Sequence, residues 1–413
     1  MDDRLPAGNI LGVNGLGRIG KLTVWYHLLR GHFQGFVVNL GRDVGTSLED
    51  VLDLLGTDST YGPVEQFLLG VSAERRLRVI SHEDGLLEVL GIPIRILRDS
   101  RDPAQLDWRR FGVRTVVDTT GAFLDPADES PSGSLRGHLA SGAGVVIASA
   151  PFKTQIGKPL PHDSAMLIYG INHRSFEPHR HRVVSAASCT TTALAHMLLP
   201  LLQADPPANI LTASLSTIHA ATSTQSVLDS VPREGAKDLR RNRATFDNLL
   251  VSTTGAAQAL EHVLPAISSV GFLADSVRIP TRTVSLINLN LTLHAALDAD
   301  GQHRFSRRSI NELYAAAAVG PQRGLLELSD RQNVSSDLRG HHAAVVIEGA
   351  ETHTRVGNIE IPADALRTQG LDAAGPLRVP VTHAKVFGWY DNEYGSYVYC
   401  LGELTRHIDS CLA

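Results

Sequence analysis

Cysteine is scarce in this chain of 413 residues, and positive charge is not in excess. Only three cysteines occur, Cys189, Cys400 and Cys411. Their number and spacing predict neither a disulfide framework nor a zinc site, so we expect reduced thiols and no bound metal. Lys and Arg number 38 against 43 Asp and Glu, which gives a formal net charge of −5. Basic residues gather only in the short stretch 240–243, which argues against nucleic acid as a partner.

Long apolar runs are absent too. No run is long enough to span a bilayer, and residues 1–6 lack the charged segment followed by an apolar one that marks a targeting signal. We therefore expect no membrane partner and a location in the cytoplasm. The sequence has 43% hydrophobic residues and no internal repeat. Its length favours two domains, because single cores stop growing well below this size.

The first third of the chain alternates short apolar strands with helical segments, which predicts a parallel sheet wrapped by helices. We expect strands at 9–13, 36–40, 114–118 and 145–148, and helices at 21–29 and 48–55. The Ser-, Gly- and Pro-containing segment 126–137 predicts a surface loop or an insertion. The middle third differs, because long β-rich runs there predict a mixed or antiparallel sheet. Those strands are expected at 211–219, 283–293 and 343–348, with helices at 255–264 and 309–318.

The sequence Asn14-Gly15-Leu16-Gly17-Arg18-Ile19-Gly20 lies between an apolar strand and a helical run. In this G-x-G-x-x-G pattern, Gly15 permits a tight turn and Gly17 lets the backbone approach a pyrophosphate. Gly20 allows the helix to pack closely on the strand, and the helix N-terminus faces the phosphates. Alone the pattern often marks only a strand-to-helix turn. Its context favours a dinucleotide site.

These observations predict an α/β fold with a Rossmann-type doubly wound parallel sheet. They also predict a second domain, an α+β catalytic domain with a mixed, largely antiparallel sheet. We expect the dinucleotide-binding domain at 1–188 and the catalytic domain at 189–390, with a C-terminal helix, 391–413, that returns to the first domain.

Residues 185–192 read Ser-Ala-Ala-Ser-Cys-Thr-Thr-Thr and precede the helical stretch 193–202. Cys189 is therefore a candidate nucleophile, because unpaired backbone N–H groups and the helix dipole favour a thiolate at a helix start. The structural alternative is a small buried residue among Ser and Thr caps. His219 ends a β-branched strand thirty residues on, and imidazole can take the proton of a thiol. With 18 histidines in the chain, a structural role for any one of them is the alternative.

The chain resembles the phosphorylating glyceraldehyde-3-phosphate dehydrogenase family, and the resemblance runs in order over nearly its whole length. The segments that carry it are residues 14–20, 101–104 (Arg-Asp-Pro-Ala), 119–123 (Thr-Thr-Gly-Ala-Phe), 188–191 (Ser-Cys-Thr-Thr), 219–225 (His-Ala-Ala-Thr-Ser-Thr-Gln), 252–257 (Ser-Thr-Thr-Gly-Ala-Ala), 278–281 (Arg-Ile-Pro-Thr), 335–337 (Ser-Ser-Asp) and 389–393 (Trp-Tyr-Asp-Asn-Glu).

The resemblance implies that Cys189 attacks an aldehyde, with His219 as base and hydrogen-bond donor. Hydride leaves for NAD or NADP, and inorganic phosphate releases the resulting thioester as an acyl phosphate. The implied partners are a phosphorylated aldehyde and inorganic phosphate, and the implied assembly is a homotetramer. Central carbon metabolism, glycolysis, is the implied pathway.

The resemblance also implies roles for individual residues. Residues implied to bind the cofactor are Asn14, Gly15, Gly17, Arg18, Ile19, Gly20, Arg42, Thr119, Thr120, Gly121 and Asn392. Those implied to bind the phosphate of the substrate are Thr222 and Arg278. Those implied to bind the attacking phosphate are Ser188, Thr190, Thr254 and Gly255, with Arg241 nearby. Each has a structural alternative: a solvated basic turn for Arg241, an edge-strand surface residue for Arg278, and turn or cap positions for the others.

The second strand departs from the family pattern. A dinucleotide fold usually places an acid about 20 residues after the glycines, where it accepts hydrogen bonds from the adenosine ribose. Leu40 stands in that place and cannot accept such a bond. Arg42 follows and suits a ribose 2′-phosphate, whereas Asp43 offers a replacement acceptor. The sequence therefore leaves the choice between NAD and NADP open.

Other departures surround the expected active site. Thr192 and Ala186 replace residues that are often Asn in the family, and Ser396 replaces an aromatic residue. Extra length occurs near 125–136 and 341–367. The alternatives that stay open are another phosphorylated aldehyde such as erythrose 4-phosphate, another acyl acceptor, and a non-catalytic nucleotide-binding scaffold.

Overall fold

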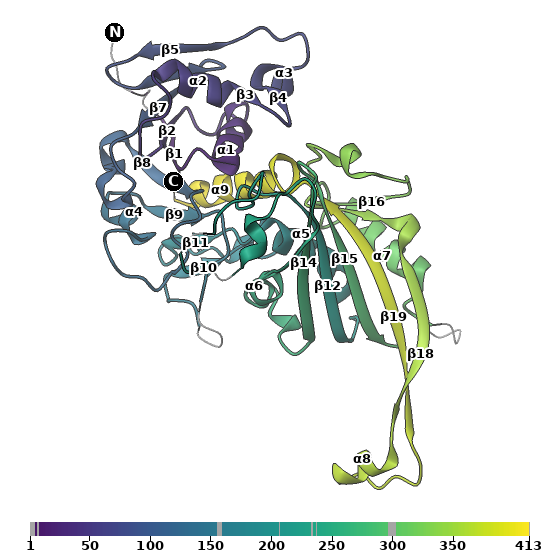
Figure 1. Cartoon of the computed structure of the whole chain (residues 1–413). Coiled ribbons are helices and arrows are strands. Elements are labelled where there is room, and N and C mark those ends of the chain that lie inside the picture. The colour runs from purple at the N-terminus through teal and green to yellow at the C-terminus, as the bar shows by residue number, and fades with distance from the viewer. Residues whose placement is uncertain are drawn as a thin grey trace. The chain divides into compact units, whose positions relative to one another are not determined.

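The computed structural model describes residues 5, 8–154, 159–205, 207–232, 234–236, 238–295 and 303–412. They form two compact units (Figure 1). The first unit comprises Met1–Thr192 and Asn392–Ala413, and the second comprises Ala193–Asp391. Within the described ranges, every helix is too short or too polar to cross a bilayer.

The first unit is built on a nine-stranded sheet with the order β10-β11-β9-β8-β1-β2-β7-β6-β5. Neighbouring strands are parallel from β10 to β7, and β6 and β5 add an antiparallel edge. The strands are β1 Ile10–Asn14, β2 Gly35–Asn39, β5 Leu77–Ser81, β6 Leu86–Val89, β7 Ile92–Leu97, β8 Val113–Asp118, β9 Val145–Ala148, β10 Ser164–Met166 and β11 Val183–Ser185. Strand β1 lies between β2 and β8, where the strand order reverses. Ligands of open α/β sheets bind at the carboxyl ends of the strands at such a point.

Helices complete the first unit and confirm the predicted Rossmann-type fold. They are α1 Arg18–Leu28, α2 Leu48–Gly56, α3 Val64–Leu69, α4 Arg136–Ala140 and α9 Tyr399–Cys411, and a small hairpin joins β3 Thr57–Asp58 to β4 Gly62–Pro63. Helix α2 begins at a capping box, in which Ser47 and Asp50 satisfy backbone N–H groups at the start of the helix. The predicted loop at 126–137 has turns and bends up to α4.

The C-terminal helix α9 is anchored to the first unit through Asp409, whose side chain is fully buried. Its carboxylate accepts hydrogen bonds from Arg114 Nε at 2.9 Å, Thr115 Oγ1 at 2.7 Å and Asn9 Nδ2 at 2.5 Å, and His32 Nε2 lies 2.9 Å away. Burial would raise the pKa of this carboxyl, but these hydrogen bonds lower it to about 2.

The second unit contains an eight-stranded sheet with the order β13-β14-β12-β15-β19-β17-β16, and β18 pairs with β19. The β12–β14 and β16–β17 pairs are parallel and the other pairs are antiparallel, which confirms the predicted mixed sheet. The strands are β12 Ile210–Ala220, β13 Leu250–Thr253, β14 Gly271–Ile279, β15 Ser285–His294, β16 Leu326–Ser329, β17 Val345–Glu348, β18 His353–Ile361 and β19 Leu377–Tyr390. Strand β15 alternates buried and half-buried residues, as the period of a strand requires.

The helices of the second unit are α6 Ala256–Val263, α7 Arg307–Val319 and α8 Ala363–Thr368, together with most of α5 Cys189–Leu202, whose first turn belongs to the first unit. Short 3₁₀ helices lie at η1 Pro103–Gln105, η2 Trp108–Phe111, η3 His173–Ser175, η4 Leu239–Asn242, η5 Pro265–Ile267, η6 Ser335–Leu338 and η7 Gly349–Glu351, and a π-helix lies at η8 Tyr394–Val398. The extra segment near 341–367 forms β17, β18 and α8. Strands β18 and β19 extend beyond the sheet as a long ribbon with α8 at its tip (Figure 1).

Candidate functional site

The glycine loop between β1 and α1 has the backbone geometry that its sequence predicts. Gly15 has a φ of +93°, and its N–H donates to Asn39 O at 2.9 Å. A Cβ on Gly20 would lie 2.0 Å from Gly15 O, so only glycine lets α1 pack this closely on the loop. A Cβ on Gly17 would meet nothing within 4 Å, and α1 has neither a side-chain cap nor an acidic residue in its first turn. The open N-terminus of this helix therefore suits an anion.

Asn14 joins the carboxyl ends of three strands through its side chain. Its Nδ2 donates to Asp118 Oδ2 at 2.7 Å, and its Oδ1 accepts from Asn39 Nδ2 at 2.8 Å. His138 Nε2 lies 3.1 Å from the same Asp118 oxygen, and Trp108 Nε1 donates to His138 Nδ1 at 2.9 Å. Burial would raise the pKa of Asp118, but hydrogen bonds from His138, Thr120 and Asn14 lower it overall. This buried hydrogen-bond network holds Asn14, the first residue of the glycine loop, in place.

The residues that follow β8 contact the glycine loop. Thr119 Oγ1 donates to Asn14 O at 3.1 Å and to Gly15 O at 2.9 Å. Thr120 N and Oγ1 donate to Asp118 Oδ1 at 3.0 Å and 2.6 Å. Gly121 has a φ of +64° and is exposed. The Thr119 hydroxyl therefore binds the glycine loop directly, and the Thr120 hydroxyl binds Asp118, which in turn binds Asn14. Gly121 lies at the surface.

Arg18 does not direct its guanidinium to open solvent. It forms ion pairs with Asp58 and Glu393, and Lys21 Nζ lies 2.8 Å from Asp58 Oδ2. Arg18 is the first residue of α1, so its backbone N–H remains part of the helix N-terminus. Ile19 packs against the core of the first unit. Asn392 is 6% exposed and belongs to the same unit as the glycine loop.

The end of β2 differs from an acid-containing dinucleotide site, as the sequence predicts. Leu40 packs against the hydrophobic core, and its N–H donates to Leu97 O at 2.8 Å. Arg42 is exposed. The carboxylate of Asp43 lies 3.3 Å from Arg98 NH1, so this acid already has a counter-charge. Arg42 and Asp43 are therefore both accessible at this strand end.

Cys189 is the first residue of α5 and is partly buried. Ser188 caps the helix, because its Oγ accepts from Thr191 N at 3.1 Å and contacts Thr191 Oγ1 at 2.7 Å. Ala187 has a φ of +55°, a costly conformation for a residue with a Cβ, and Tyr397 Oη donates to its carbonyl at 3.2 Å. Backbone strain next to a nucleophile is typical of functional turns.

The other residues near this turn are buried. Thr190 is 4% exposed and faces little solvent. The family departures Ala186, Thr192 and Ser396 are also buried within the first unit.

His219 lies near the end of β12, directly opposite Arg278 of the parallel neighbour β14. Arg278 NH1 is 2.6 Å from His219 Nδ1, and Ala220 O is 2.8 Å from the same nitrogen. Burial and the positive charge of Arg278 together lower the pKa of His219 to about 3. His219 is therefore a neutral imidazole at neutral pH, as a general base must be.

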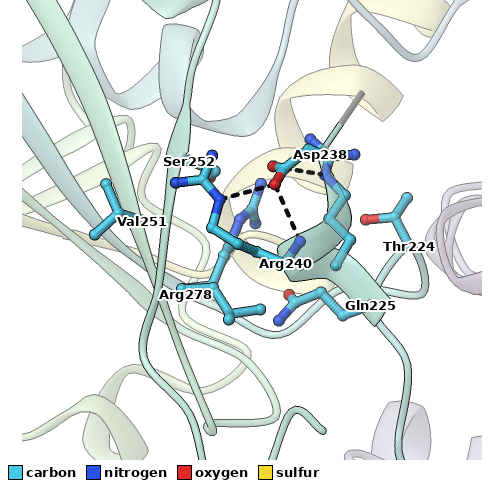
Figure 2. A pocket seen from close by; sticks show the side chains of 9 residues that line it. Thr224, Gln225, Asp238, Arg240, Val251, Ser252 and Arg278 are labelled. Carbon is cyan, nitrogen blue, oxygen red and sulfur yellow. Dashed lines mark hydrogen bonds and ion pairs between the residues drawn. The ribbon is translucent and has the colours of Figure 1, made fainter. Parts of the chain in front are cut away.

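Arg278 also lines a pocket in the second unit (Figure 2). The space between its lining side chains is small and partly open to solvent. Its lining comprises Thr224, Gln225, Asp238, Arg240, Arg241, Leu250, Val251, Ser252 and Arg278. Asp238 Oδ1 accepts from Arg240 Nε at 2.8 Å, and Arg241 Nε lies 3.8 Å from Asp238 Oδ2. Three guanidinium groups facing one carboxylate leave excess positive charge, which suits an oxyanion.

The sequence prediction named Arg241 and Arg278 here but missed Asp238, Arg240 and Ser252. A signal for two of them was present, because Asp-Leu-Arg-Arg places an acid where it can cap a short helix and contact the following arginines. Ser252 gave no such signal. Its position in the pocket depends on the pairing of β13 with β14.

Three more predicted phosphate positions, Thr222, Thr254 and Gly255, lie on the loops of the second unit. Thr222 Oγ1 contacts Thr224 Oγ1 at 3.0 Å, and Thr222 N donates to Gln225 Oε1 at 3.1 Å, which ties this turn to two pocket residues. Thr254 Oγ1 accepts from Ala256 N at 3.3 Å. Gly255 is the N-cap of α6, and a Cβ there would meet nothing within 4 Å.

Comparison with known proteins covers almost the whole chain. The family model for the glyceraldehyde 3-phosphate dehydrogenase NAD binding domain matches residues 10–126, and the model for the C-terminal domain matches residues 188–362. Glyceraldehyde-3-phosphate dehydrogenase 2 of Bacillus subtilis (strain 168) is 30% identical over 399 residues, which is 96% of each chain. The glyceraldehyde-3-phosphate dehydrogenase of Kitasatospora aureofaciens is 33% identical over 387 residues, 93% of this chain and 95% of the relative. These matches show that the chain belongs to the glyceraldehyde-3-phosphate dehydrogenase family.

Proposed function

We propose that this protein oxidises glyceraldehyde 3-phosphate to 1,3-bisphosphoglycerate with uptake of inorganic phosphate. The observation that carries the proposal is the placement of Cys189 as the first residue of α5, behind the Ser188 cap. A thiol in this position is exposed to the positive end of the helix dipole, which favours its nucleophilic form. Family membership over nearly the whole chain supports the choice of reaction.

In the proposed reaction, the sulfur of Cys189 attacks the aldehyde carbon while His219 removes the thiol proton. His219 then gives that proton to the former carbonyl oxygen, which makes a thiohemiacetal, and takes it back when the hydride leaves the carbon. A nicotinamide cofactor, when bound, would supply the acceptor for the hydride, and loss of the hydride would leave an acyl thioester on Cys189. An oxygen of inorganic phosphate attacks that carbon, the carbon–sulfur bond breaks, and the acyl phosphate leaves with the thiolate restored.

The residues proposed to hold the cofactor are those of the glycine loop, the turn after β8, and Asn392. The open backbone at Gly17 and the uncapped start of α1 fit a pyrophosphate. We propose that NADP is used beside or instead of NAD, because Leu40 offers no ribose acceptor and Arg42, two residues on, is exposed. Arginine is well suited to a 2′-phosphate because its planar fork of donors can bind two oxygens.

Two anion sites are proposed in the second unit and the first turn of α5. Arg278 and Thr222 would bind the phosphate of the aldehyde, since Arg278 lines the positively charged pocket. Thr254, Gly255 and Arg241, with Thr190 and Ser188 of the Cys189 turn, would bind the attacking phosphate. The hydroxyl of Ser188 is engaged in its cap, so its contribution would include holding that turn in shape.

A steady-state assay tests the proposal. Nicotinamide reduction is followed with glyceraldehyde 3-phosphate and each cofactor, with and without inorganic phosphate, for the wild type and Cys189→Ser. We expect a phosphate-dependent rate that falls at least 10³-fold in the variant, because serine is a far weaker nucleophile at neutral pH. A rate found only with erythrose 4-phosphate would mean that the substrate is a different aldehyde. A rate that does not depend on phosphate would mean that the acyl acceptor is different. No rate with any aldehyde, or full turnover in the variant, would overturn the proposal.

Family resemblance also leads us to propose a homotetramer in the cytoplasm. Light scattering coupled to size-exclusion chromatography tests the assembly, and a mass near that of one 44.5 kDa chain would contradict it.

A further inference from the structure

The ribbon of β18 and β19 runs past the rest of the sheet of the second unit (Figure 1). Strand β15 pairs with β19 as far as Val381, whereas β18 pairs with β19 as far as Leu377. Among the described residues, the ribbon beyond this point consists of these two strands with α8 at the tip. A two-stranded hairpin alone is only marginally stable in water and gains stability by packing against a further surface. The ribbon is therefore a segment that a partner would stabilise.

The register of the two strands places apolar side chains together on one face of the ribbon, because residues directly opposite each other share a face. Ile359 lies opposite Val379. In the next row of the same face, Ile361 lies opposite Leu377. Ile359 is 44% exposed and Leu377 is 48% exposed. These four residues are called the apolar patch. Their exposure at the unsupported end of the ribbon favours burial against another apolar surface.

Basic side chains occupy the same face nearer to the body of the sheet. Arg355 lies opposite His383, and in the next row His353 lies opposite Lys385. These four residues are called the basic block. His353 Nε2 is 3.4 Å from Glu351 Oε2, but no described carboxylate lies within 4.0 Å of the other three side chains. Arg355 and Lys385 therefore leave positive charge on this part of the ribbon, which favours an acidic neighbour.

The tip of the ribbon has an excess of acid. Residues 362–376 contain Asp364 in the first turn of α8, Asp372 in the loop that follows, and a single basic residue, Arg367. All three side chains are exposed. Arg367 NH1 donates to Ala373 O at 3.1 Å, and no described basic nitrogen lies within 4.0 Å of either carboxylate. Both carboxylates of the tip are therefore accessible to a basic neighbour.

The ribbon thus carries a basic block, an apolar patch and an acidic tip in that order along its length. Two copies of the ribbon are complementary when they lie face to face and run in opposite directions. Each acidic tip then meets the basic block of the other copy, and the two apolar patches meet in the middle. A two-fold axis produces this arrangement, because it brings the same surface of each copy together. A parallel arrangement would oppose segments of like charge.

The size of this face shows what the contact can contribute. Nine residues at about 3.3 Å each, on two strands about 4.8 Å apart, give a face of roughly 300 Å². A stable complex buries roughly 800 Å² on each partner. The ribbon contact is therefore too small to hold two copies together alone, and it would add to other surfaces within the assembly.

We propose that the ribbon is an arm for self-association, in which the face that carries the apolar patch packs against the same face of a second copy of this chain. The acidic tip of each copy lies on the basic block of the other. The inference rests on the proposed association of several copies of the chain, and it goes beyond that proposal by naming the surface and its orientation.

Disulfide trapping tests the contact directly. Ile359→Cys places a thiol in the apolar patch, near the expected two-fold axis, and Cys411→Ser removes the exposed native thiol. Copper phenanthroline in air is the oxidant, and non-reducing electrophoresis measures the covalent dimer. Asn358→Cys is the matched control, because Asn358 is the exposed neighbour on the opposite face. We expect the covalent dimer to form at least tenfold faster with Ile359→Cys than with Asn358→Cys.

Charge reversal tests the orientation. One variant makes the basic block acidic through Arg355→Glu and Lys385→Glu, and another makes the tip basic through Asp364→Lys and Asp372→Lys. Each variant alone opposes like charges, so trapping at Ile359→Cys should slow at least tenfold at low salt. When both chains are co-expressed, each acidic segment meets a basic one again. The mixed dimer, recognised by a mass tag on one chain, should then form at a rate within twofold of that without charge reversal.

Three results would overturn the inference: equal trapping at positions 358 and 359, unchanged trapping in either charge variant, or no recovery in the mixed chains. The comparison of positions 358 and 359 decides the matter even if a charge variant does not fold. Absence of trapping at position 359, with binding of the protein to vesicles of anionic phospholipid, would also overturn it and assign this face to a membrane.

Light scattering separates this inference from the proposed assembly and reaction. A tetramer that gives no cross-link at position 359 would reject the ribbon contact alone. The mass of a single chain would reject the assembly and the ribbon contact together. Failure of the aldehyde assay with intact trapping would reject the proposed reaction alone.

Discussion

The two units contain buried histidines with opposite hydrogen-bonding situations. In the first unit, His138 has complementary neighbours, since Trp108 donates to Nδ1 and Asp118 accepts from Nε2. In the second unit, Nδ1 of His219 faces a donor and an acceptor at once. A ring with complementary neighbours keeps one tautomer and serves structure. A ring whose Nδ1 faces both a donor and an acceptor has no neutral tautomer that satisfies both neighbours.

The largest expected effect is on catalysis. His219→Asn removes the proposed base, so kcat is expected to fall by about 10²- to 10⁴-fold. Steady-state kinetics provide the measurement, and urea unfolding shows whether the variant remains folded. A kcat within a few-fold of wild type would mean that the competing neighbours of His219 do not mark the base.

The complementary histidine is expected to affect stability instead. His138→Leu leaves the buried carboxylate of Asp118 and the indole N–H of Trp108 without their partner, which should lower the free energy of unfolding by about 2–3 kcal/mol. Urea unfolding at pH 7 measures this loss. Trp108→Phe, which removes the N–H donor together with part of the buried ring, measures the other half of the network. Unchanged stability of His138→Leu would show that the network is not structural.

His27 of α1 extends the comparison, because it is fully buried and neither ring nitrogen has a hydrogen-bond partner. Burial lowers the pKa of His27 from 6.5 to about 3. Between these pH values the unfolded chain binds a proton that the folded chain excludes, so stability is full above pH 6.5 and falls as the pH decreases. This group should cost about 2 kcal/mol between pH 6.5 and pH 5.

Replacing His27 by leucine tests that cost. Urea unfolding of the wild type and His27→Leu at pH 7 and pH 5 should show a smaller acid-induced loss in the variant, by about 2 kcal/mol. Equal losses in both proteins would mean that His27 is solvated in the folded state.

The smallest expected effect concerns the strand ends of the first unit. Leu40→Asp adds a charged acceptor after β2. A new hydrogen bond from the ribose to this carboxylate is worth about 1.5 kcal/mol, so the ratio of kcat/KM for NAD to kcat/KM for NADP should rise about tenfold. Kinetics with both cofactors measure this ratio. A strong and equal preference for NAD in both proteins would remove the idea that Leu40 relaxes selectivity.

Local patterns predicted many elements of the fold. The helix predicted at 309–318 lies within α7, Arg307–Val319, and the strand predicted at 114–118 lies within β8. The antiparallel edge formed by β5 and β6 was not predicted, because its strands carry charged residues such as Arg78 and Glu88 that obscure the alternation. The ribbon of β18 and β19 was noticed only as extra length, since its pairing joins residues that local patterns cannot relate.

In the candidate site too, local motifs predicted some features, whereas contacts between distant residues were not predicted. The positions of Cys189 and the glycine loop follow from motifs, because a helix start and a tight turn are encoded by adjacent residues. The contact between His219 and Arg278 depends on the parallel register of β12 and β14, residues separated by 59 positions. Sequence reasoning therefore named both residues but assigned them separate tasks.

The anchoring of α9 has a consequence for how the protein is made. Asp409 binds side chains of Asn9, Arg114 and Thr115, yet it leaves the ribosome only after the whole second unit has been made. The sheet of the first unit cannot gain this buried counter-charge until the second unit has been synthesised. A chain terminated before Asp409 would keep every glycine of the dinucleotide loop and still lack the carboxylate on which four side chains converge.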